Sequence, residues 1–254
     1  MDAITIEALS KTFKGKRGRS VEALQGLQLS IPPGEVFGFL GPNGAGKSTT
    51  IKILMGLIRA TGGQASIMGI PVSSHTARRN VGYLPENPSF YDYLTAEEYL
   101  NFTGKMFGMT GPMLHERSQA MLHRLDLWEA RQRPIRTYSK GMTQRLGLAQ
   151  ALLHDPQVYI LDEPMSGLDP IGRALVKEII LELKAAGKCV FFSTHITSDA
   201  EAICDRVGII LQGRLQCVER VETIMTPDAE LSPGDSAQQS LEKFFLEIVR
   251  KGSH

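Results

Sequence analysis

The sequence predicts an α/β protein, and three observations support this class. Strand-like apolar runs alternate with loops and helical stretches, which is typical of α/β proteins. The run at 36–40 is continuously apolar, as expected for a strand buried on both faces. Further strand-like runs follow a long helical stretch and would complete the same sheet: 158–161, 189–192 and 207–211.

The composition is that of a globular protein, with 42% hydrophobic and 22% charged residues in a chain of 254. Basic and acidic side chains number 28 and 27, so the net charge of +1 gives no general reason for nucleic-acid binding. The three cysteines form no CxxC pair, which excludes a disulfide scaffold or a zinc site as the organising feature. No apolar run reaches the roughly 20 residues of a membrane-spanning helix. The N-terminus lacks the basic start of a secretory signal, so we expect a cytoplasmic location.

The first forty residues are expected to form strands. Apolar residues alternate with polar neighbours at 4–6 and at 27–31, as in half-buried strands. Residues 15–19 are basic and punctuated by glycine, and two interpretations stay open: a solvated hairpin tip, or a segment that attracts an anion. Short strands are expected again near 65–68 and 81–84.

The pattern then changes to helix. From residue 95 to about 150, apolar and aromatic residues recur at helical spacing, which predicts a helical insertion, and another helix is expected at about 172–186. Residues 226–240 have the composition of a linker, and the apolar spacing of 241–249 predicts an amphipathic helix. The expected division is a main domain at 1–222, a helical subdomain within it at about 87–150, and a linker with a terminal helix at 223–254.

A glycine-rich segment joins the buried strand to the helix that follows. Its residues are Gly41, Pro42, Asn43, Gly44, Ala45, Gly46, Lys47 and Ser48. They have the spacing of a P-loop, in the strand-to-helix context that this motif requires. Such a backbone directs successive N–H groups at phosphate oxygens, and the helix N-terminus adds positive potential. The alternative is a glycine-rich turn that matches by chance, and the flanking strand and helix disfavour it.

The residues at the end of this loop predict which ligands it takes. Lys47 is expected to neutralise the β- and γ-phosphates of a bound nucleotide, and the Ser48 hydroxyl is placed to bind Mg²⁺. Thr49 is the expected backup contact. The loop therefore predicts a site for a nucleotide and Mg²⁺.

Polar side chains also follow two of the later strands. Asp162 and Glu163 end the run at 158–161, at the sheet edge where open α/β sheets bind ligands. Asp162 is expected to hold Mg²⁺, and Glu163 to polarise a water for attack on the γ-phosphate. His195 follows the run at 189–192 and would arrive at the same edge. The alternatives are an ordinary surface Asp-Glu pair and a histidine that is merely a satisfied polar residue.

Residues 138–145, Tyr-Ser-Lys-Gly-Met-Thr-Gln-Arg, resemble the signature motif of the ABC ATPases, and the resemblance runs from about residue 2 to 222. It implies the fold of that family: a P-loop NTPase with a mixed sheet core, an N-terminal antiparallel β subdomain and a helical subdomain. In the family, the P-loop of one subunit faces the signature of another. The resemblance therefore implies that Ser139 and Gly141 contact the γ-phosphate bound by a second copy, with two ATP molecules between the copies.

The resemblance assigns roles to further residues. Phe13 would stack on adenine, although an ordinary core aromatic at a strand end fits the sequence equally well. Asp169, in the loop 166–169, would couple the two sites across the interface, and His195 would be the switch histidine. The aromatic-rich stretch at 87–137 would receive a helix of the membrane partner, or else form a small core of its own. We expect an exposed apolar groove near 86–93.

Two positions depart from the family pattern. Lys140 stands where many members carry glycine, and a cation there is compatible with the nearby γ-phosphate. Glu86 stands where most members have a glutamine that touches Mg²⁺ and links ATP to the membrane partner. An ionised glutamate cannot donate a hydrogen bond, although it can still ligate the metal. These features resemble the exporter class whose permeases are separate six-helix chains.

The resemblance thus implies an ATP-hydrolysing subunit of an ABC exporter. ATP would close a dimer of two copies, hydrolysis at Glu163 would reopen it, and integral membrane permease subunits would convert this motion into transport. The chain would lie peripherally on the cytoplasmic face of the cell membrane, with no nucleic-acid partner. Two alternatives remain: a soluble ABC ATPase that acts on ribosomes, nucleic acid or an assembly partner, and a regulatory module that binds ATP without turning it over.

Overall fold

The structure, a computed structural model, describes residues 1–15, 19–226 and 240–251. Most of the basic turn expected at 15–19 and of the linker expected at 226–240 lies outside these residues. Among the described helices, none is long and apolar enough to cross a membrane.

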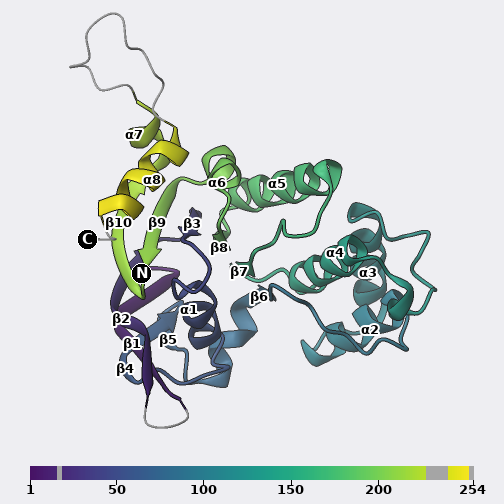
Figure 1. Ribbon diagram of the computed structural model, residues 1–254. Helices are drawn as coiled ribbons and strands as arrows, with labels where there is room; N and C mark the ends of the chain where they lie inside the picture. The colour runs from purple at the N-terminus through teal and green to yellow at the C-terminus, as the bar shows by residue number, and fades with distance from the viewer. Residues whose placement is uncertain (16–18, 227–239, 252–254) are drawn as a thin grey trace, which may run out of the picture.

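A six-stranded sheet forms the centre of the molecule (Figure 1), in the order β10-β9-β3-β8-β7-β6. Its strands are β3 (Val36–Leu40), β6 (Val81–Leu84), β7 (Val158–Asp162), β8 (Cys189–Thr194), β9 (Arg206–Leu211) and β10 (Arg214–Arg220). All neighbours pair in parallel except β10, which runs antiparallel to β9. The expected mixed sheet is confirmed.

A second sheet of four antiparallel strands, in the order β2-β1-β4-β5, lies at the N-terminal end of the chain. Its strands are β1 (Ile4–Lys14), β2 (Ser20–Ile31), β4 (Gly62–Ile67) and β5 (Ile70–Pro71). The pairing of β1 with both neighbours shifts register near Ala8, whose φ of 47° is in the left-handed region. This sheet is the antiparallel β subdomain that was expected.

Helices cover both faces of the central sheet. Helix α1 (Lys47–Leu54) follows β3, and α2 (Ala96–Met106), α3 (Gly111–Arg124) and α4 (Lys140–Leu152) gather to one side of the molecule (Figure 1). The remaining helices are α5 (Pro170–Ala185), α6 (Thr197–Ile203), α7 (Val221–Met225) and α8 (Leu241–Lys251), with short 3₁₀ turns at His75–Asn80 and Ile135–Thr137. The helical insertion and the terminal amphipathic helix are both present.

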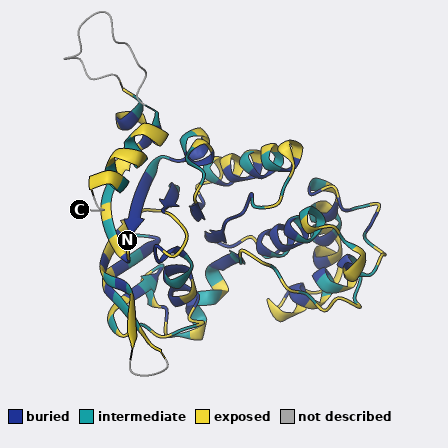
Figure 2. Ribbon diagram, viewed as in Figure 1, coloured by how far each residue is buried: buried dark blue, intermediate teal, exposed yellow. Residues whose placement is uncertain are grey.

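The two faces of β3 explain its unbroken apolar sequence. Val36 and Leu40 belong to a core between the sheet and helices α4 to α6, whereas Phe37 and Phe39 belong to a second core shared with α1 and the antiparallel sheet. Figure 2 shows these strands as buried, in dark blue, with exposed residues on the outer faces of the helices. Because β3 lies between two cores, the loop that follows it starts from a fixed position.

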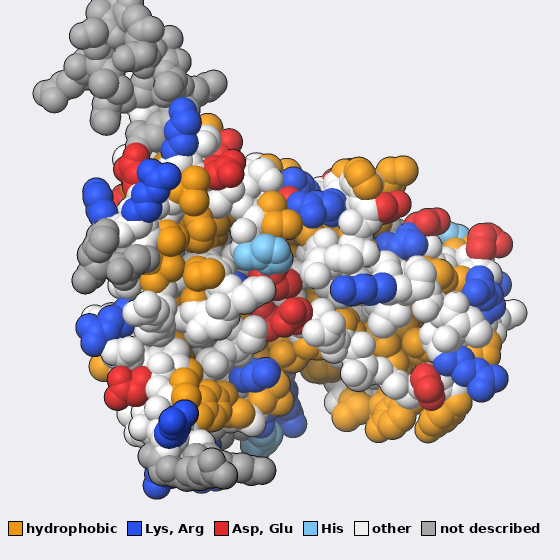
Figure 3. All heavy atoms as spheres, in the orientation of Figure 1, with side chains coloured by type: hydrophobic (Ala, Val, Ile, Leu, Met, Phe, Trp, Pro, Cys, Tyr) orange, Lys and Arg blue, Asp and Glu red, His pale blue; other side chains and the backbone are white. Residues whose placement is uncertain are grey.

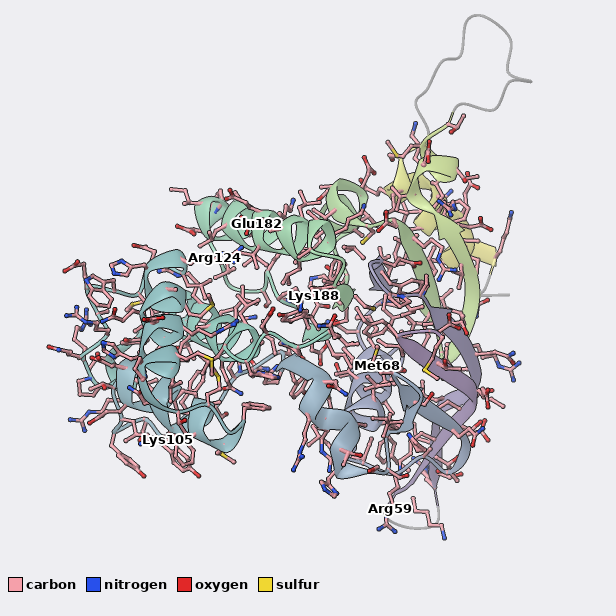
Figure 4. The ribbon with its side chains drawn as sticks, turned by 180° about the vertical axis from the view of Figure 1, so that it is seen from behind. Arg59, Met68, Lys105, Arg124, Glu182 and Lys188 are labelled. Atoms are coloured by element: carbon pink, nitrogen blue, oxygen red, sulfur yellow. The ribbon has the colours of Figure 1, made fainter. Side chains whose placement is uncertain are left out.

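Two ion pairs join the helical insertion and the loop after α4 to the rest of the molecule. Arg124 of α3 pairs with Glu182 of α5, and both residues are labelled in Figure 4. Lys188 before β8 pairs with Asp155 at 3.2 Å. In each pair the acidic partner is about half exposed, so each pair stabilises the fold only slightly.

The sequence did not predict every element. Strand β10 and helices α6 and α7 were not expected, because they are short and half-exposed and carry little of the periodicity that marks a buried face. Helix α8 packs against α6, α7 and β9, so it contributes to the same core as the main domain. The boundary expected at 222 stays a prediction.

Substituting Gly82 with Ala should destabilise the protein. An added Cβ in β6 would lie 2.4 Å from the carbonyl oxygen of Ala151 and 2.7 Å from the ring of Tyr159, so helix α4 would have to move. We expect the free energy of unfolding to fall by about 1–3 kcal/mol, measured by urea denaturation. Gly62→Ala is the control, since its Cβ would meet only ordinary contact at 3.8 Å. An unchanged Gly82→Ala protein would contradict this account of the β6 and α4 contact.

Candidate functional site

The glycine-rich loop is shaped by close backbone contacts on both sides. A Cβ on Gly41 would lie 2.4 Å from the carbonyl oxygen of Ile210, so no larger residue fits there. Gly46 has φ of 114°, and a Cβ on it would lie 2.7 Å from the carbonyl oxygen of Ala23. The loop is therefore held between β9 and β2, and α1 begins directly after it.

This loop forms one wall of a cavity of about 300 Å³. The other residues of the lining come from three further elements: β2, the loop after β6, and the end of β7. The lining residues are Ala23, Pro42, Asn43, Gly44, Gly46, Lys47, Ser48, Thr49, Glu86 and Glu163. Most of the expected loop residues, together with Glu86 and Glu163, are thus brought to one place.

Lys47 is the buried cation of this cavity, with 6% of its surface exposed. Its Nζ donates to the carbonyl oxygens of Gly41 (2.6 Å) and Pro42 (3.3 Å), and lies 3.7 Å from Oε1 of Glu163. Burial lowers the pKa of the Lys47 ammonium from its ordinary value, while the carboxylates of Glu163 and Asp162 act in the opposite direction. A cation held by carbonyl dipoles in this way faces any anion that enters the cavity.

Asp162 lies at the end of β7 and accepts two hydroxyl hydrogen bonds on Oδ1. Ser193 Oγ donates to it at 2.5 Å, and Ser48 Oγ donates at 3.5 Å. The Ser48 hydroxyl and the Asp162 carboxylate are hard oxygen donors of the kind that Mg²⁺ prefers. In the described part of the chain, no group of three or more His, Cys, Asp or Glu side chains is arranged so that it could hold a metal ion by itself. These residues fit a Mg²⁺ that takes its other ligands from phosphate and water.

Glu163 has an unusual backbone. Its φ of 51° lies in the left-handed region, which costs a residue other than glycine about 1–2 kcal/mol. Its side chain is largely buried, and Nδ1 of His195 lies 3.0 Å from both of its carboxylate oxygens. The neighbouring strand β8 holds this backbone conformation, because the Glu163 N–H donates to Ser193 Oγ at 3.0 Å. Strain of this kind, supported by neighbouring groups, concentrates at functional sites.

Sequence reasoning missed three residues of this site: Ser193, Gln144 and Ala23. Ser193 is fully buried and joins the Glu163 N–H to the Asp162 carboxylate. Gln144 of α4 donates to the carbonyl oxygens of Glu163 and Pro164. A polar pair, Ser193 and Thr194, at the end of an apolar strand was the available signal for the first of them.

The residues expected at the signature, the loop 166–169 and the adenine position do not line this cavity. Ser139 is the N-cap of α4 and accepts the Met142 N–H at 3.2 Å, and Asp169 is the N-cap of α5 and accepts the Gly172 N–H at 2.8 Å. Gly141 lies beside the loop 166–169, since its Cβ position is 3.6 Å from the Leu168 side chain. Phe13 is exposed on β1, with the Lys11 ammonium 5.0 Å from its ring centre.

The helical part carries an exposed apolar surface (Figure 3, lower right). Tyr91 and Tyr93 are 53% and 71% exposed, and the Tyr91 ring lies 6.0 Å from that of Phe102. Met106 and Met113 extend the surface onto α2 and α3. Exposed aromatic side chains thus occur within the segment 86–93, and exposed apolar side chains continue beyond it, while a groove there stays a prediction.

The central mixed sheet, the glycine-rich loop after β3 and the acidic end of β7 together define the ABC ATPase fold. A solved structure described as the ATP-binding subunit of an ABC transporter superposes with a TM-score of 0.84 at 30% identity, covering 97% of this chain and 99% of that one. A dimeric, post-hydrolysis ATP-binding cassette bound to ADP and Pi has the same fold, with a TM-score of 0.80 at 24% identity over 86% of this chain and 98% of that one.

The family model described as ABC transporter matches residues 24–166, and this chain belongs to that family. An uncharacterized ABC transporter ATP-binding protein of Synechocystis sp. is 48% identical over 83% of this chain. The linearmycin resistance ATP-binding protein LnrL of Bacillus subtilis is 38% identical over 76% of it. The chain spans 60% and 62% of the lengths of these two relatives.

Proposed function

We propose that this chain binds ATP with Mg²⁺ and hydrolyses it as the ATP-binding subunit of an ABC exporter. One observation carries the proposal. A buried lysine, a hydroxyl, two carboxylates and a histidine lie together at the C-terminal ends of β3, β7 and β8, beside the glycine-rich loop 41–46. These residues are Lys47, Ser48, Asp162, Glu163 and His195. Family membership supports the same conclusion.

In the proposed reaction, backbone N–H groups of 41–46 and the N-terminus of α1 bind the phosphates, and Lys47 neutralises their charge. Its present partners, two carbonyls and Glu163, are groups that it can exchange for phosphate oxygens. Ser48 and Asp162 would hold Mg²⁺, with Glu86 at the cavity wall as a further oxygen ligand. When bound, Mg²⁺ neutralises charge on the β- and γ-phosphates.

Glu163 is the proposed general base. Its carboxylate faces the cavity, so it can take a proton from a water that attacks the γ-phosphate. His195 contacts both carboxylate oxygens and would hold the base in its orientation. The histidine side chain is half-exposed, so it can also reach a phosphate oxygen at the mouth of the site.

A second copy of the chain is the proposed partner at the signature motif. Ser139 and Gly141 lie outside the cavity of their own chain, at the solvent-exposed N-terminus of α4, where backbone N–H groups can meet an anion. In the proposed dimer they meet the γ-phosphate bound by the partner, with Asp169 beside them. Phe13 would offer its exposed ring to adenine after the Lys11 ammonium moves aside.

The proposed membrane partner is a separate integral permease, bound through the exposed apolar surface of the helical part. An exposed group of aromatic and Met side chains of this kind is typical of an interaction site. The chain would then lie peripherally on the cytoplasmic face of the cell membrane. Export is favoured over import by the resistance function in the name of the LnrL relative.

Substituting Lys47 with Ala should weaken ATP binding by about 10- to 100-fold, since a charge-assisted hydrogen bond contributes about 1.5–3 kcal/mol. Binding of a fluorescent ATP analogue and Mg²⁺-dependent phosphate release would measure the change. Lys52→Ala is the matched control, because Lys52 is an exposed lysine on the same helix. Equal binding by Lys47→Ala and wild type would overturn the assignment of the site.

The transport proposal has a separate test. Affinity capture from detergent-solubilised membranes, with ATP and Mg²⁺, should recover a polytopic membrane protein in near-equal amount. Recovery of ribosomal or other non-membrane proteins alone would contradict the transport proposal. The proposal that the chain hydrolyses ATP would still stand.

A further inference from the structure

Gln144 is a buried polar residue that the proposed mechanism does not yet use. It lies on α4 with 3% of its surface exposed. Its Nε2 donates to two successive carbonyl oxygens, those of Glu163 at 3.3 Å and Pro164 at 3.2 Å. A side chain on α4 thus reaches across to the two peptide carbonyls that directly follow the Cα of Glu163, the residue whose carboxylate faces the cavity.

These hydrogen bonds complete a clamp on the strained peptide of Glu163. On one side, Ser193 Oγ of β8 accepts the Glu163 N–H. On the other side, the Glu163 carbonyl accepts from the Ser166 N–H at 3.0 Å and from Gln144. Pro164 has no N–H of its own and cannot hold the next peptide by donation. Ser193 thus ties this turn to β8, and Gln144 ties it to helix α4.

The position of Gln144 on α4 links Glu163 to the N-terminal end of that helix. The helix begins at Lys140 with Ser139 as its N-cap, so Gln144 lies little more than one turn from the end that carries Ser139 and Gly141. The buried residues of α4 include Leu146, Leu148 and Ala149, which pack in the main core. A helix held this firmly moves as a unit, and a shift of its N-terminus shifts the donors of Gln144 relative to Glu163.

We infer that Gln144 is a positioning residue: it transmits the position of the α4 N-terminus to Glu163 within the same chain. The inference rests on the proposed function. In the dimer proposed above, the α4 N-terminus meets the nucleotide of the partner. Through its two hydrogen bonds, Gln144 would then make the position of Glu163 at one nucleotide site depend on whether the other site is occupied. This coupling would need no movement of the loop 41–46.

The test replaces Gln144 with Met, which has the same length and no donors. We expect kcat for Mg²⁺-ATP to fall about tenfold or more, because small displacements of a catalytic group have large effects on rate. The KM for ATP should change less than about twofold, because the nucleotide contacts are untouched. Gln150→Met is the matched control: Gln150 lies on the same helix, but accepts its hydrogen bond from Tyr99 at 2.7 Å, away from Glu163.

A double variant separates positioning from a general structural effect. If Gln144 acts through the Glu163 carboxylate, adding Gln144→Met to Glu163→Gln should leave the residual hydrolysis rate unchanged. A further loss of the same size as in the wild-type background would overturn the inference. So would an equal loss of kcat in Gln150→Met, or an unchanged kcat in Gln144→Met.

Folding is checked by circular dichroism at the assay temperature. Should Gln144→Met not fold, Gln144→Glu takes its place, because it keeps the length and a polar end but has no N–H donor, and the same loss of kcat is expected. Absence of Mg²⁺-dependent hydrolysis in the wild-type protein would contradict the proposed function itself. The role of Gln144 is judged separately, from the kcat of each variant relative to the wild-type kcat.

Discussion

Glu163→Gln is expected to stop ATP hydrolysis while ATP binding is kept. The glutamine has the same size and accepts the hydrogen bond of His195 through its carbonyl oxygen, but it cannot take a proton from water. General-base catalysis contributes about 10²- to 10⁴-fold, so kcat should fall by that factor. The affinity for ATP should stay the same or rise, since the negative charge 3.7 Å from Lys47 is removed.

Phosphate release and equilibrium binding of ATP would be measured on the same preparation. Glu35→Gln is the matched control, because Glu35 is another partly buried glutamate, paired with Arg206 at 2.9 Å and outside the cavity. Turnover of Glu163→Gln at more than about half the wild-type rate would remove Glu163 from the role of base. Loss of ATP binding in the same variant would instead mean that Glu163 serves to hold the cavity open.

Asp199→Asn is expected to be the most destabilising change in the α5 and α6 region. The Asp199 side chain is 2% exposed, and its oxygens accept from Arg173 Nη2 at 2.7 and 2.8 Å and lie 3.0 Å from Lys177 Nζ. Removing the charge leaves two cations of α5 without their anion. Breaking a buried pair in this way costs about 3–5 kcal/mol, and the partial exposure of both cations favours the lower end.

Urea denaturation would measure the loss. Asp126→Asn is the control, since Asp126 pairs with Arg145 but is 89% exposed, and an exposed pair contributes at most about 1 kcal/mol. Similar losses in the two variants would show that burial does not set the strength of the Asp199 pairs. Because Asp199 follows His195 by four residues, the same change is expected to loosen the start of α6 and reduce hydrolysis.

Local sequence patterns were sufficient for the parts of the site that lie on one strand or loop. The apolar run at 36–40 predicted a strand buried on both faces, and the glycine spacing after it predicted the loop and the start of α1. Asp162, Glu163 and His195 were predicted as strand-end residues, and parallel pairing of β7 with β8 brings their strands side by side. These predictions use only the hydrophobic pattern along the chain and the position of polar residues after each strand. Neither requires knowledge of tertiary contacts.

The missed residues act through contacts between separate elements, and a local pattern can at most mark such a residue without showing its partner. Ser193 reaches Asp162 only because the two residues are aligned in the pairing of β7 with β8, and one change of register would separate them. Gln144 reaches Glu163, 19 residues away in the chain, because α4 packs against β6, the strand that pairs with β7. The reverse holds for Ser139, Gly141 and Asp169: the motif predicts their role, but that role needs a second molecule.

The central place of β3 has a consequence for how the protein is made. Its neighbours are β8 and β9, and Val36 donates its N–H to Asp205, 169 residues later. During synthesis at about 5–20 residues per second, the strand that precedes the phosphate loop waits roughly ten to thirty seconds for both partners. Contacts so distant in sequence also slow folding. The ability to hold a nucleotide is therefore acquired late, after β9 has been synthesised, and until then the apolar segment of β3 is available to chaperones.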